Sequence, residues 1–183
     1  MDLKILFSRS NQNIKIPVKN EFKPGYDLYI DMEWFKKSHS SMAILKHGQS
    51  IRLSTGIKSI FPKEYYIQIE EKYSTGLIAL KKSAGIIDSQ YRDIWEVLVV
   101  NTSNKRIILC DNIIFNKLKE DENYTKHNVL YNIENDSLFQ FIIHRVPNVN
   151  FEEISEKDIS NYKLEQTSAS RIKKLLNRIK GKL

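Results

Sequence analysis

Short segments in which apolar and polar residues alternate run along the first 150 residues of this 183-residue chain. Alternation with a period of two places apolar side chains on one face of a β-strand, and glycine, proline, asparagine and aspartate separate the segments. Strands are expected at residues 14–18, 26–30, 65–69, 94–100, 106–109, 113–115 and 138–146, and residues 51–60 are expected to form two short strands separated by a break at residues 55–56. The pattern predicts an all-β sandwich, jelly roll or barrel, with a charged surface excursion at residues 117–128.

Residues 85–93 predict a hairpin that carries a functional group. A glycine and two isoleucines lead to Asp88, Tyr91 follows three residues later, and residues 94–100 form an apolar return strand. A carboxylate fixed beside an aromatic ring suits a site that stacks a sugar or base and activates water. The same residues also fit an ordinary turn with a solvated aspartate and a packing tyrosine, so this segment alone leaves both interpretations open.

Composition narrows the class of protein. No apolar run is long enough to span a bilayer, and the start lacks the apolar core and cleavage site of a signal peptide. The single cysteine, Cys110, lies in an apolar stretch, which favours burial in a reducing interior over catalysis. The four histidines are scattered without metal-ligand spacing. We expect a soluble, cytoplasmic protein, and the Asn, Ile and Lys usage hints at an AT-rich source such as a phage or mobile element.

Positive charge gathers at the C-terminus. The net charge is +7, and residues 171–183 contain six basic residues and no acid, so the rest is close to neutral and lacks a nucleic-acid footprint. Apolar residues at helical spacing predict a basic amphipathic helix within an extension, residues 151–183, that follows a β domain at residues 1–150. Because no second membrane anchor accompanies the helix, we expect it to pack on the protein assembly or a protein partner.

Four segments resemble motifs of the trimeric dUTPase family, and they occur in the family's order. Residues 24–29 (PGYDLY) are similar to A-G-Y-D-L, and residues 54–57 (STGI) with 61–66 (FPKEYY) to the T-G-I and P-x-G-Y scaffold. Residues 85–91 (GIIDSQY) are similar to G-V-I-D-x-x-Y, and residues 136–143 (DSLFQFII) to G-D-x-I-A-Q-L-I. The resemblance covers most of the chain and implies a dUTPase-like β-clip, a distorted jelly-roll barrel.

That resemblance implies cleavage of dUTP to dUMP and pyrophosphate by attack of water on the α-phosphorus. Asp88 matches the family's general base. Tyr91 matches a residue that packs against deoxyribose and excludes a ribose 2′-hydroxyl. The main chain of Gly85, Ile86 and Ile87 would then read uracil.

The remaining matches imply a cofactor and an assembly. Asp27 matches a carboxylate that helps to organise water around Mg²⁺, which itself prefers phosphate oxygens and water. Gln140 matches a glutamine that contacts nucleotide or phosphate across a subunit boundary. The resemblance therefore implies a homotrimer with active sites between subunits.

The second motif departs from the family pattern, R-S-x-L-A, whose arginine and serine grip phosphate. Lys72 supplies a charge here but not a bidentate fork. Ser74 or Thr75, together with the Gly76 amide, remain as hydrogen-bond donors. The adjacent glutamates at positions 70 and 71 repel a triphosphate unless they point away.

The fifth motif departs further. The family has a glycine-rich tail whose amides wrap the phosphates, and this chain has the basic helix instead. Arg171 can contact phosphate from that helix, and the alternative is that the helix touches no substrate. Asp93 also stands where the third motif commonly has glycine.

Three functions remain open. Retention of Asp27, Asp88, Tyr91 and Gln140 supports a dUTP diphosphatase with a modified phosphate grip. The altered second motif and the missing fifth motif support a catalytically impaired nucleotide-binding, regulatory or protein-interaction module on the same fold. A related nucleotide enzyme, such as a dCTP-deaminase-like protein, would need a glutamate base where this chain has Asp88.

Overall fold

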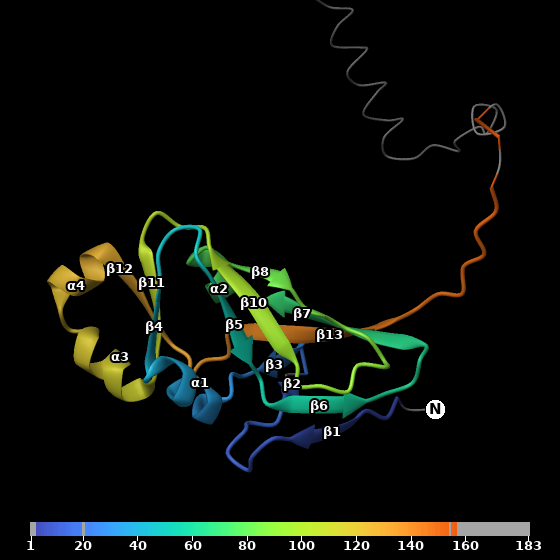
Figure 1. Ribbon diagram of the computed structural model, residues 1–183, viewed down its shortest axis with the longest axis horizontal. Coiled ribbons are helices and arrows are strands. Elements are labelled where there is room, and N and C mark those ends of the chain that lie inside the picture. The colour runs from blue at the N-terminus through green and yellow to red at the C-terminus, as the bar shows by residue number, and fades with distance from the viewer. Residues whose placement is uncertain (1–2, 20, 154, 157–183) are drawn as a thin grey trace, which may run out of the picture. The chain divides into compact units, whose positions relative to one another are not determined.

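The computed structural model describes residues 3–19, 21–153 and 155–156 (Figure 1). The chain divides into two compact units, Met1–Pro147 and Asn148–Leu183. The first unit contains the described strands and helices. The predicted basic helix and Arg171 lie outside the described residues, so both stay predictions, as does the predicted domain boundary.

A five-stranded antiparallel sheet is the largest layer of the first unit. Its strands, in spatial order, are β2 (Val18–Lys19), β3 (Tyr26–Leu28), β13 (Phe139–Arg145), β7 (Tyr65–Glu71) and β9 (Ile86–Ile87). A three-stranded antiparallel sheet contains β5 (Ser50–Ser54), β10 (Glu96–Asn101) and β8 (Leu80–Ala84). The remaining elements of this region are the strand pair β1 (Leu6–Arg9) and β6 (Ile57–Ile60), and the short helix α2 (Tyr73–Leu77).

The hydrophobic core combines the inward faces of both sheets. Phe139 and Phe141 on β13 are buried, as are Val97 and Val99 on β10. Trp95 is 2% exposed and meets Phe141 edge to face, with ring centroids 5.3 Å apart. Each such side chain contributes about 1.5–3 kcal/mol by leaving water. The apolar residues of the alternating pattern are therefore buried in the core, and the predicted all-β class is confirmed.

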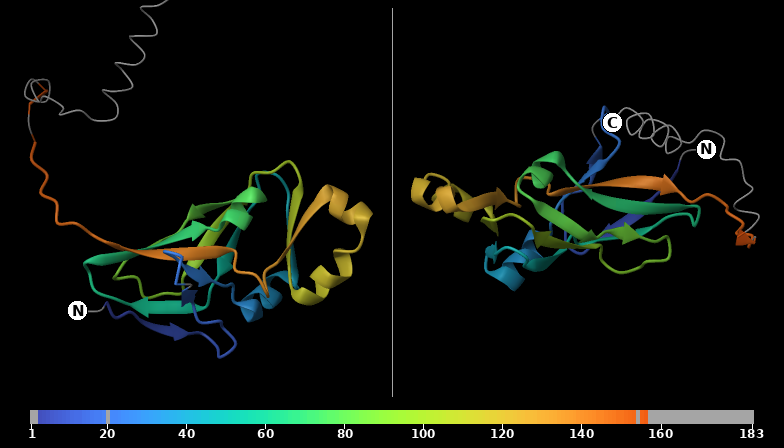
Figure 2. Two further views of the ribbon diagram at one scale, coloured as in Figure 1. Left: turned by 180° about the vertical axis from the view of Figure 1, so that it is seen from behind. Right: turned by 90° about the horizontal axis from the view of Figure 1, so that it is seen from above.

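A third sheet lies at one end of this unit, next to the described helices other than α2 (Figures 1 and 2). Its strands are β4 (Met42–Leu45), β11 (Arg106–Cys110) and β12 (Asn128–Asn132), and the helices are α1 (Met32–His39), α3 (Asn112–Leu118) and α4 (Glu122–His127). β11 and β12 run parallel, so α3 and α4 form the crossover that a parallel pair requires.

The strand expected at residues 113–115 is wrong, because those residues lie in α3. The Asp111 side chain accepts a hydrogen bond from the Ile114 backbone N–H at 2.9 Å and so caps the helix. The predicted surface excursion is also helical in part. Cys110 is buried, as expected, and this burial, with the charge of Asp111, raises the pKa of its thiol to about 11.

The predicted hairpin exists, but its connection is wide. Its arms are β8 and β10, which pair from Asn101 and Leu80 as far as Leu98 and Ala84. Beyond Ala84 the chain leaves this sheet and forms β9 on the edge of the five-stranded sheet. Asp88 therefore lies in a long connection between two sheets, and not in a turn that joins β8 directly to β10.

The T-G-I segment holds the end of that connection, at Trp95, just before β10 begins. The Thr55 hydroxyl and amide both donate to the Trp95 carbonyl, at 2.9 and 3.0 Å, and the Trp95 amide donates to the Ile57 carbonyl at 2.8 Å. Gly56 has a φ of +68°, and a β-carbon there would lie 2.9 Å from the Asp31 carboxylate. The bend thus requires glycine. None of the described helices is long and apolar enough to cross a membrane.

Candidate active site

β9 presents its main chain at an open edge of the five-stranded sheet. Ile87 pairs with Ile67, and the Ile69 amide donates to the Gly85 carbonyl at 2.8 Å. Because hydrogen bonding alternates along an antiparallel strand, the N–H and C=O of Ile86 point away from β7. Among the described strands, none pairs with β9 on that side. Ile86 therefore offers one donor and one acceptor, side by side, to a ligand.

Gly85 brings β9 close to its neighbours. A β-carbon on Gly85 would lie 2.8 Å from Lys82 Cδ and 3.2 Å from the Ile69 carbonyl oxygen. A larger residue would push the chain away from β7 just before the open edge. Glycine is thus needed here for close approach.

Asp88 and Tyr91 face a hollow of about 470 Å³ just beyond β9. The other residues that line it are Lys63, Tyr65, Tyr66, Ser89, Gln90 and Val146. The Asp88 side chain is exposed, and it has no hydrogen-bond or ion-pair partner within the described part of the chain. Its carboxylate is therefore available to accept a proton from a bound water.

Tyr91 is held in place by the turn that carries it. Its amide donates to the Asp88 carbonyl at 3.0 Å, and its hydroxyl donates to the Ile94 carbonyl at 3.1 Å. Burial, followed by the charges of Asp93 and Glu96, raises the pKa of the Tyr91 phenol above its ordinary value. The ring therefore stays neutral, with 37% of the residue exposed beside Asp88. We call Ile86, Asp88 and Tyr91 the hairpin group.

A second set of polar side chains lies on the face of the five-stranded sheet that points away from the core. Asp27, Gln140 and Glu70 are cross-strand neighbours on β3, β13 and β7. The Lys72 ammonium lies 2.9 Å from the Asp27 carboxylate and donates to the Ser137 hydroxyl at 2.6 Å. We call Asp27, Lys72, Gln140 and Glu70 the sheet-face group.

The two glutamates beside Lys72 both have donors. Glu70 lies 3.4 Å from the Lys82 ammonium and accepts a hydrogen bond from the Gln68 amide. Glu71 turns to β8 and accepts from the Lys82 backbone N–H at 2.7 Å. These partners offset part of the repulsion that the glutamates would exert on a phosphate ligand.

The other residues of the altered second motif lie on α2. Ser74 is exposed, whereas Thr75 is buried and donates to the Leu138 carbonyl at 2.5 Å. The Gly76 amide donates to the Lys72 carbonyl at 2.9 Å within the helix. A ligand can reach Ser74 directly, but it would have to compete for the Gly76 amide. Their role in binding stays a prediction.

Within one chain, the structure does not bring the hairpin group and the sheet-face group together. Ile87, which precedes Asp88, pairs with Ile67, and Ile67 pairs with Ile143 on β13. Gln140 is three residues earlier on β13, so Asp88 and Gln140 are about 13 Å apart along the strand direction. They are also two strands apart across the sheet.

Gln140 is itself held by close packing. A β-carbon on Gly25 would lie 2.7 Å from Gln140 Oε1, so the glycine of the first motif makes room for this side chain. Sequence reasoning missed two partners of the sheet-face group: the Ser137 hydroxyl, which accepts from Lys72, and Lys82, which pairs with Glu70. Ser137 follows the aspartate of the fourth motif, but no residue pattern marks Lys82, because its contact with Glu70 arises where two sheets meet.

A resident metal site is not formed by the described residues, which contain no group of three or more His, Cys, Asp or Glu side chains suited to hold an ion. Asp27 is one carboxylate, already paired with Lys72. Mg²⁺ binds through phosphate oxygens and water, with one or two carboxylates. The sheet-face group is therefore compatible with a Mg²⁺ ion that arrives with a phosphate ligand, and the contact of Asp27 with that ion through water stays a prediction.

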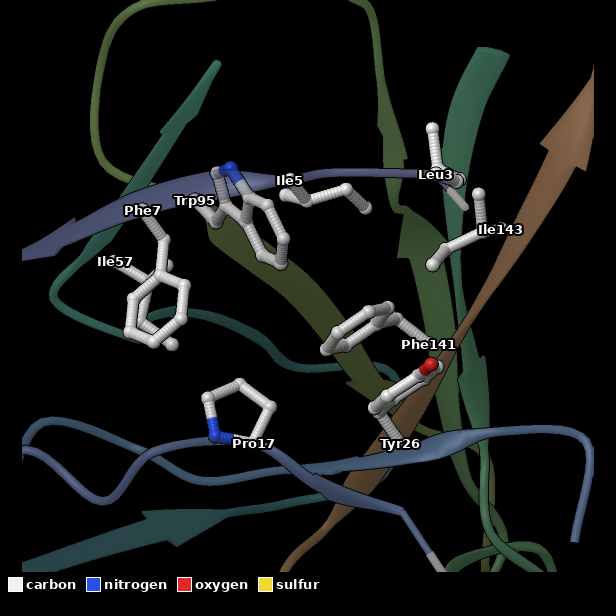
Figure 3. Close-up of a pocket in the computed structure, with 9 residues that line it drawn as sticks. All are labelled: Leu3, Ile5, Phe7, Pro17, Tyr26, Ile57, Trp95, Phe141 and Ile143. Atoms are coloured by element: carbon white, nitrogen blue, oxygen red, sulfur yellow. The ribbon is translucent and has the colours of Figure 1, made fainter. Parts of the chain in front are cut away.

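A separate hollow of about 250 Å³ lies on the core side of the same sheet (Figure 3). It is lined by Leu3, Ile5, Phe7, Pro17, Tyr26, Ile57, Trp95, Phe141 and Ile143. Figure 3 shows the Tyr26 ring against Phe141, and the two rings are stacked with centroids 5.0 Å apart. This apolar lining offers no carboxylate or ammonium for polar chemistry.

Comparison with known proteins agrees with the motifs. No protein-family model matches the chain. The deoxyuridine 5′-triphosphate nucleotidohydrolase of Fusobacterium nucleatum subsp. nucleatum is 27% identical over 118 residues, which are 62% of this chain and 64% of that relative. The chain thus spans slightly less than two-thirds of the relative's length.

Solved structures share the fold at low identity. The EIAV dUTPase has a TM-score of 0.56 at 15% identity, covering 84% of this chain and 98% of that one. A mutant dUTPase from phage phi11 of S. aureus has a TM-score of 0.58 at 14% identity, covering 84% of this chain and 97% of that one. The chain therefore resembles a dUTPase in sequence and shares the dUTPase fold. Its dUTPase-like β-clip, a distorted jelly-roll barrel, confirms the predicted fold.

The dUTPase fold accounts for where the motifs lie in space. The first and fourth motifs are adjacent strands, β3 and β13, and the third is the open edge of β9. The T-G-I scaffold holds Trp95, at the end of the connection that carries Asp88. The roles of Asp88, Tyr91, Gln140, Lys72 and Asp27 stay predictions.

Proposed function

We propose that this chain is a dUTP diphosphatase that hydrolyses dUTP to dUMP and pyrophosphate. The observation that carries the proposal is the open edge of β9, which ends at an exposed carboxylate beside a fixed tyrosine. The name of the Fusobacterium relative and the dUTPase fold support it over a non-catalytic binding module.

Each member of the hairpin group has a chemical task in this reaction. Uracil has adjacent donor and acceptor atoms, which the Ile86 carbonyl and amide complement. Tyr91 would pack against deoxyribose and leave no room for a 2′-hydroxyl. Asp88 would accept a proton from the water that attacks the α-phosphorus, as the P–O bond to the leaving pyrophosphate breaks.

The sheet-face group would bind the phosphates. Lys72 can donate to an anionic oxygen, and Ser74 and Gln140 can donate neutral hydrogen bonds. Mg²⁺, when bound, would neutralise phosphate charge, and Asp27 would hold one of its waters. A structural Mg(II) ion is described for the phage phi11 dUTPase.

The distance between the two groups supports a homotrimer in which neighbouring chains share each site. The hairpin group of one chain would face the sheet-face group of the next, since a single chain keeps them apart. The predicted C-terminal helix would add contacts to this assembly or to a protein partner, and Arg171 would be its phosphate contact.

Turnover of a dNTP panel with Mg²⁺, with pyrophosphate release as the readout, tests the activity. We expect dUTP to be hydrolysed in preference to dCTP, dTTP and UTP. Hydrolysis of dCTP or UTP at the same rate, or of none of the nucleotides, would overturn the proposal.

Co-expression of Asp88→Asn with Gln140→Ala tests the shared site. In random trimers about a quarter of the sites would combine an intact Asp88 with an intact Gln140 from the neighbouring chain. Partial recovery of turnover in the mixture, with neither variant active alone, is the expected result. No recovery in trimers verified to be mixed, or a monomer by sedimentation, would contradict it.

A further inference from the structure

Lys82 is a charged residue that none of the family motifs explains. Its ammonium lies 3.4 Å from the Glu70 carboxylate, and its side chain is only 16% exposed. Its stem passes over Gly85, where a β-carbon would lie 2.8 Å from Lys82 Cδ. Lys82 therefore reaches from β8, over the entry to β9, toward the outer face of the five-stranded sheet.

Glu70 places this ammonium beside the sheet-face group. Glu70 pairs with Gln140 across β7 and β13, and Gln140 pairs with Asp27 on its other side. Directly paired side chains lie about 5 Å apart on the same face of a sheet. The Lys72–Asp27 and Lys82–Glu70 ion pairs therefore flank Gln140 on opposite sides.

We propose that Lys82 is a second phosphate-binding lysine, which Glu70 holds until the triphosphate of the nucleotide replaces it. The proposal rests on the proposed function and names a residue for it. A largely buried ammonium needs an anionic partner, and a phosphate oxygen meets that need as well as a carboxylate does. Glu70 keeps the Gln68 amide as a donor after the exchange.

This arrangement explains how the chain manages without the arginine of the second motif. One arginine offers a fork of two donors to a phosphate, whereas a lysine is a point charge. Lys72 and Lys82 approach the Gln140 position from two sides, so together they present two separate donors. Each lysine has its own carboxylate, which keeps the group close to neutral when no nucleotide is bound.

The test compares Lys82→Met with Lys81→Met in the full-length protein. Methionine keeps the aliphatic stem that covers Gly85 and removes the charge, and Lys81 is an exposed neighbour on β8 whose side chain alternates to the other face. Calorimetry would use the non-hydrolysable α,β-imido-dUTP and, separately, deoxyuridine. We expect Lys82→Met to weaken binding of the triphosphate about tenfold or more and to leave deoxyuridine affinity within about twofold. Lys81→Met should change neither.

Glu70→Gln should change the affinity for α,β-imido-dUTP in the opposite direction to Lys82→Met. Removing the competing carboxylate frees Lys82, so we expect α,β-imido-dUTP to bind several-fold more tightly. A purely structural ion pair predicts that Glu70→Gln and Lys82→Met weaken binding alike, and this outcome would overturn the proposal. Thermal melts show whether each variant is folded. If Lys82→Met does not fold, Glu70→Gln still tests the proposal, because the proposal expects tighter binding of α,β-imido-dUTP and a structural ion pair predicts weaker binding.

The two proposals fail in different ways. Wild-type protein that binds neither deoxyuridine nor α,β-imido-dUTP contradicts the proposed function, and the role of Lys82 falls with it. If the wild-type protein binds α,β-imido-dUTP and Lys82→Met binds it as tightly as Lys81→Met does, only the role of Lys82 is contradicted.

Discussion

The hairpin group and the sheet-face group of this protein are built by different means. The hairpin group depends on main-chain geometry and the position of one ring: an unpaired β9 edge, a glycine packed against β7, and a tyrosine fixed by the carbonyl of Ile94. The sheet-face group depends on paired charges, Lys72 with Asp27 and Lys82 with Glu70.

This difference explains where the sequence keeps the family pattern and where it does not. A surface read by main-chain groups and shape requires a particular glycine, turn and ring, so few substitutions preserve it. A phosphate is bound by any suitably placed cation, so charge can move from an arginine in one motif to lysines on neighbouring strands. The third motif, which carries the hairpin group, therefore keeps most of the family pattern, whereas the second motif, which contributes Lys72 to the sheet-face group, is altered.

The largest expected effect comes from the carboxylate of the hairpin group. Asp88→Asn keeps size and hydrogen bonding but loses basicity, so turnover should fall roughly 10²-fold or more while α,β-imido-dUTP still binds. Steady-state kinetics and calorimetry would measure the two quantities. Asp93→Asn removes the same charge from the same connection and should keep most of the activity. Unchanged turnover in Asp88→Asn would assign the base to another residue.

Gly85, next to the hairpin group, and Gly76, next to the sheet-face group, allow a matched comparison of two glycine-to-alanine substitutions. Gly85→Ala places a β-carbon against the Ile69 carbonyl and the Lys82 stem, which should cost about 1–3 kcal/mol of folding free energy and displace the β9 edge. Gly76→Ala meets no atom within 4 Å and lies in α2, where alanine should stabilise the helix by up to about 1 kcal/mol.

Chemical denaturation and deoxyuridine binding would be measured for both glycine variants. Loss of stability and of deoxyuridine affinity in Gly85→Ala alone is the expected result. Equal behaviour of the two variants would show that the close approach at Gly85 does not shape the hairpin group.

Much of this contrast was predictable from the sequence. Alternation at residues 65–69 and 138–146 predicted β7 and β13. The family resemblance implied separate roles at the nucleotide site for Asp27 and Gln140, and the structure places these residues side by side on adjacent strands. These features depend on local pattern and on residue order.

Other features depend on contacts between distant segments, which no local pattern encodes. The Lys82–Glu70 pair forms where two sheets meet, and the widened connection around Asp88 arises because β9 pairs with β7 rather than with β10. Residues 113–115 are apolar and β-branched in part, yet the cap at Asp111 makes them helical. Here side-chain capping outweighs strand propensity.

Tyr91 should have a smaller effect, confined to sugar selection. Tyr91→Ala opens space for a 2′-hydroxyl, so the preference for dUTP over UTP should narrow by about tenfold. Tyr91→Phe loses only the hydrogen bond to the Ile94 carbonyl and should keep that preference. Competition between the two nucleotides in a turnover assay measures it. A wild-type protein without preference would contradict the role given to the ring.

The smallest expected effect concerns Asp111, which belongs to neither group and whose charge contributes to folding stability. Burial opposes ionisation of Asp111, but hydrogen bonds from Ile114 and Ser41 and the charge of Lys36 lower the pKa of this carboxyl. A pKa that is lower in the folded state stabilises the fold above the unfolded value of about 4, and this contribution is lost as pH falls through the folded value.

Asp111→Asn can still accept the capping hydrogen bond but carries no charge, so it should cost about 1 kcal/mol or less at neutral pH. The cost should shrink as acid protonates the wild-type carboxyl. Asp111→Ala removes the cap as well and should remain destabilised by about 1 kcal/mol in acid. Urea denaturation of the three proteins at pH 7 and at acidic pH measures these differences. If the cost of Asp111→Asn were equal at both pH values, the Asp111 charge would contribute nothing to stability.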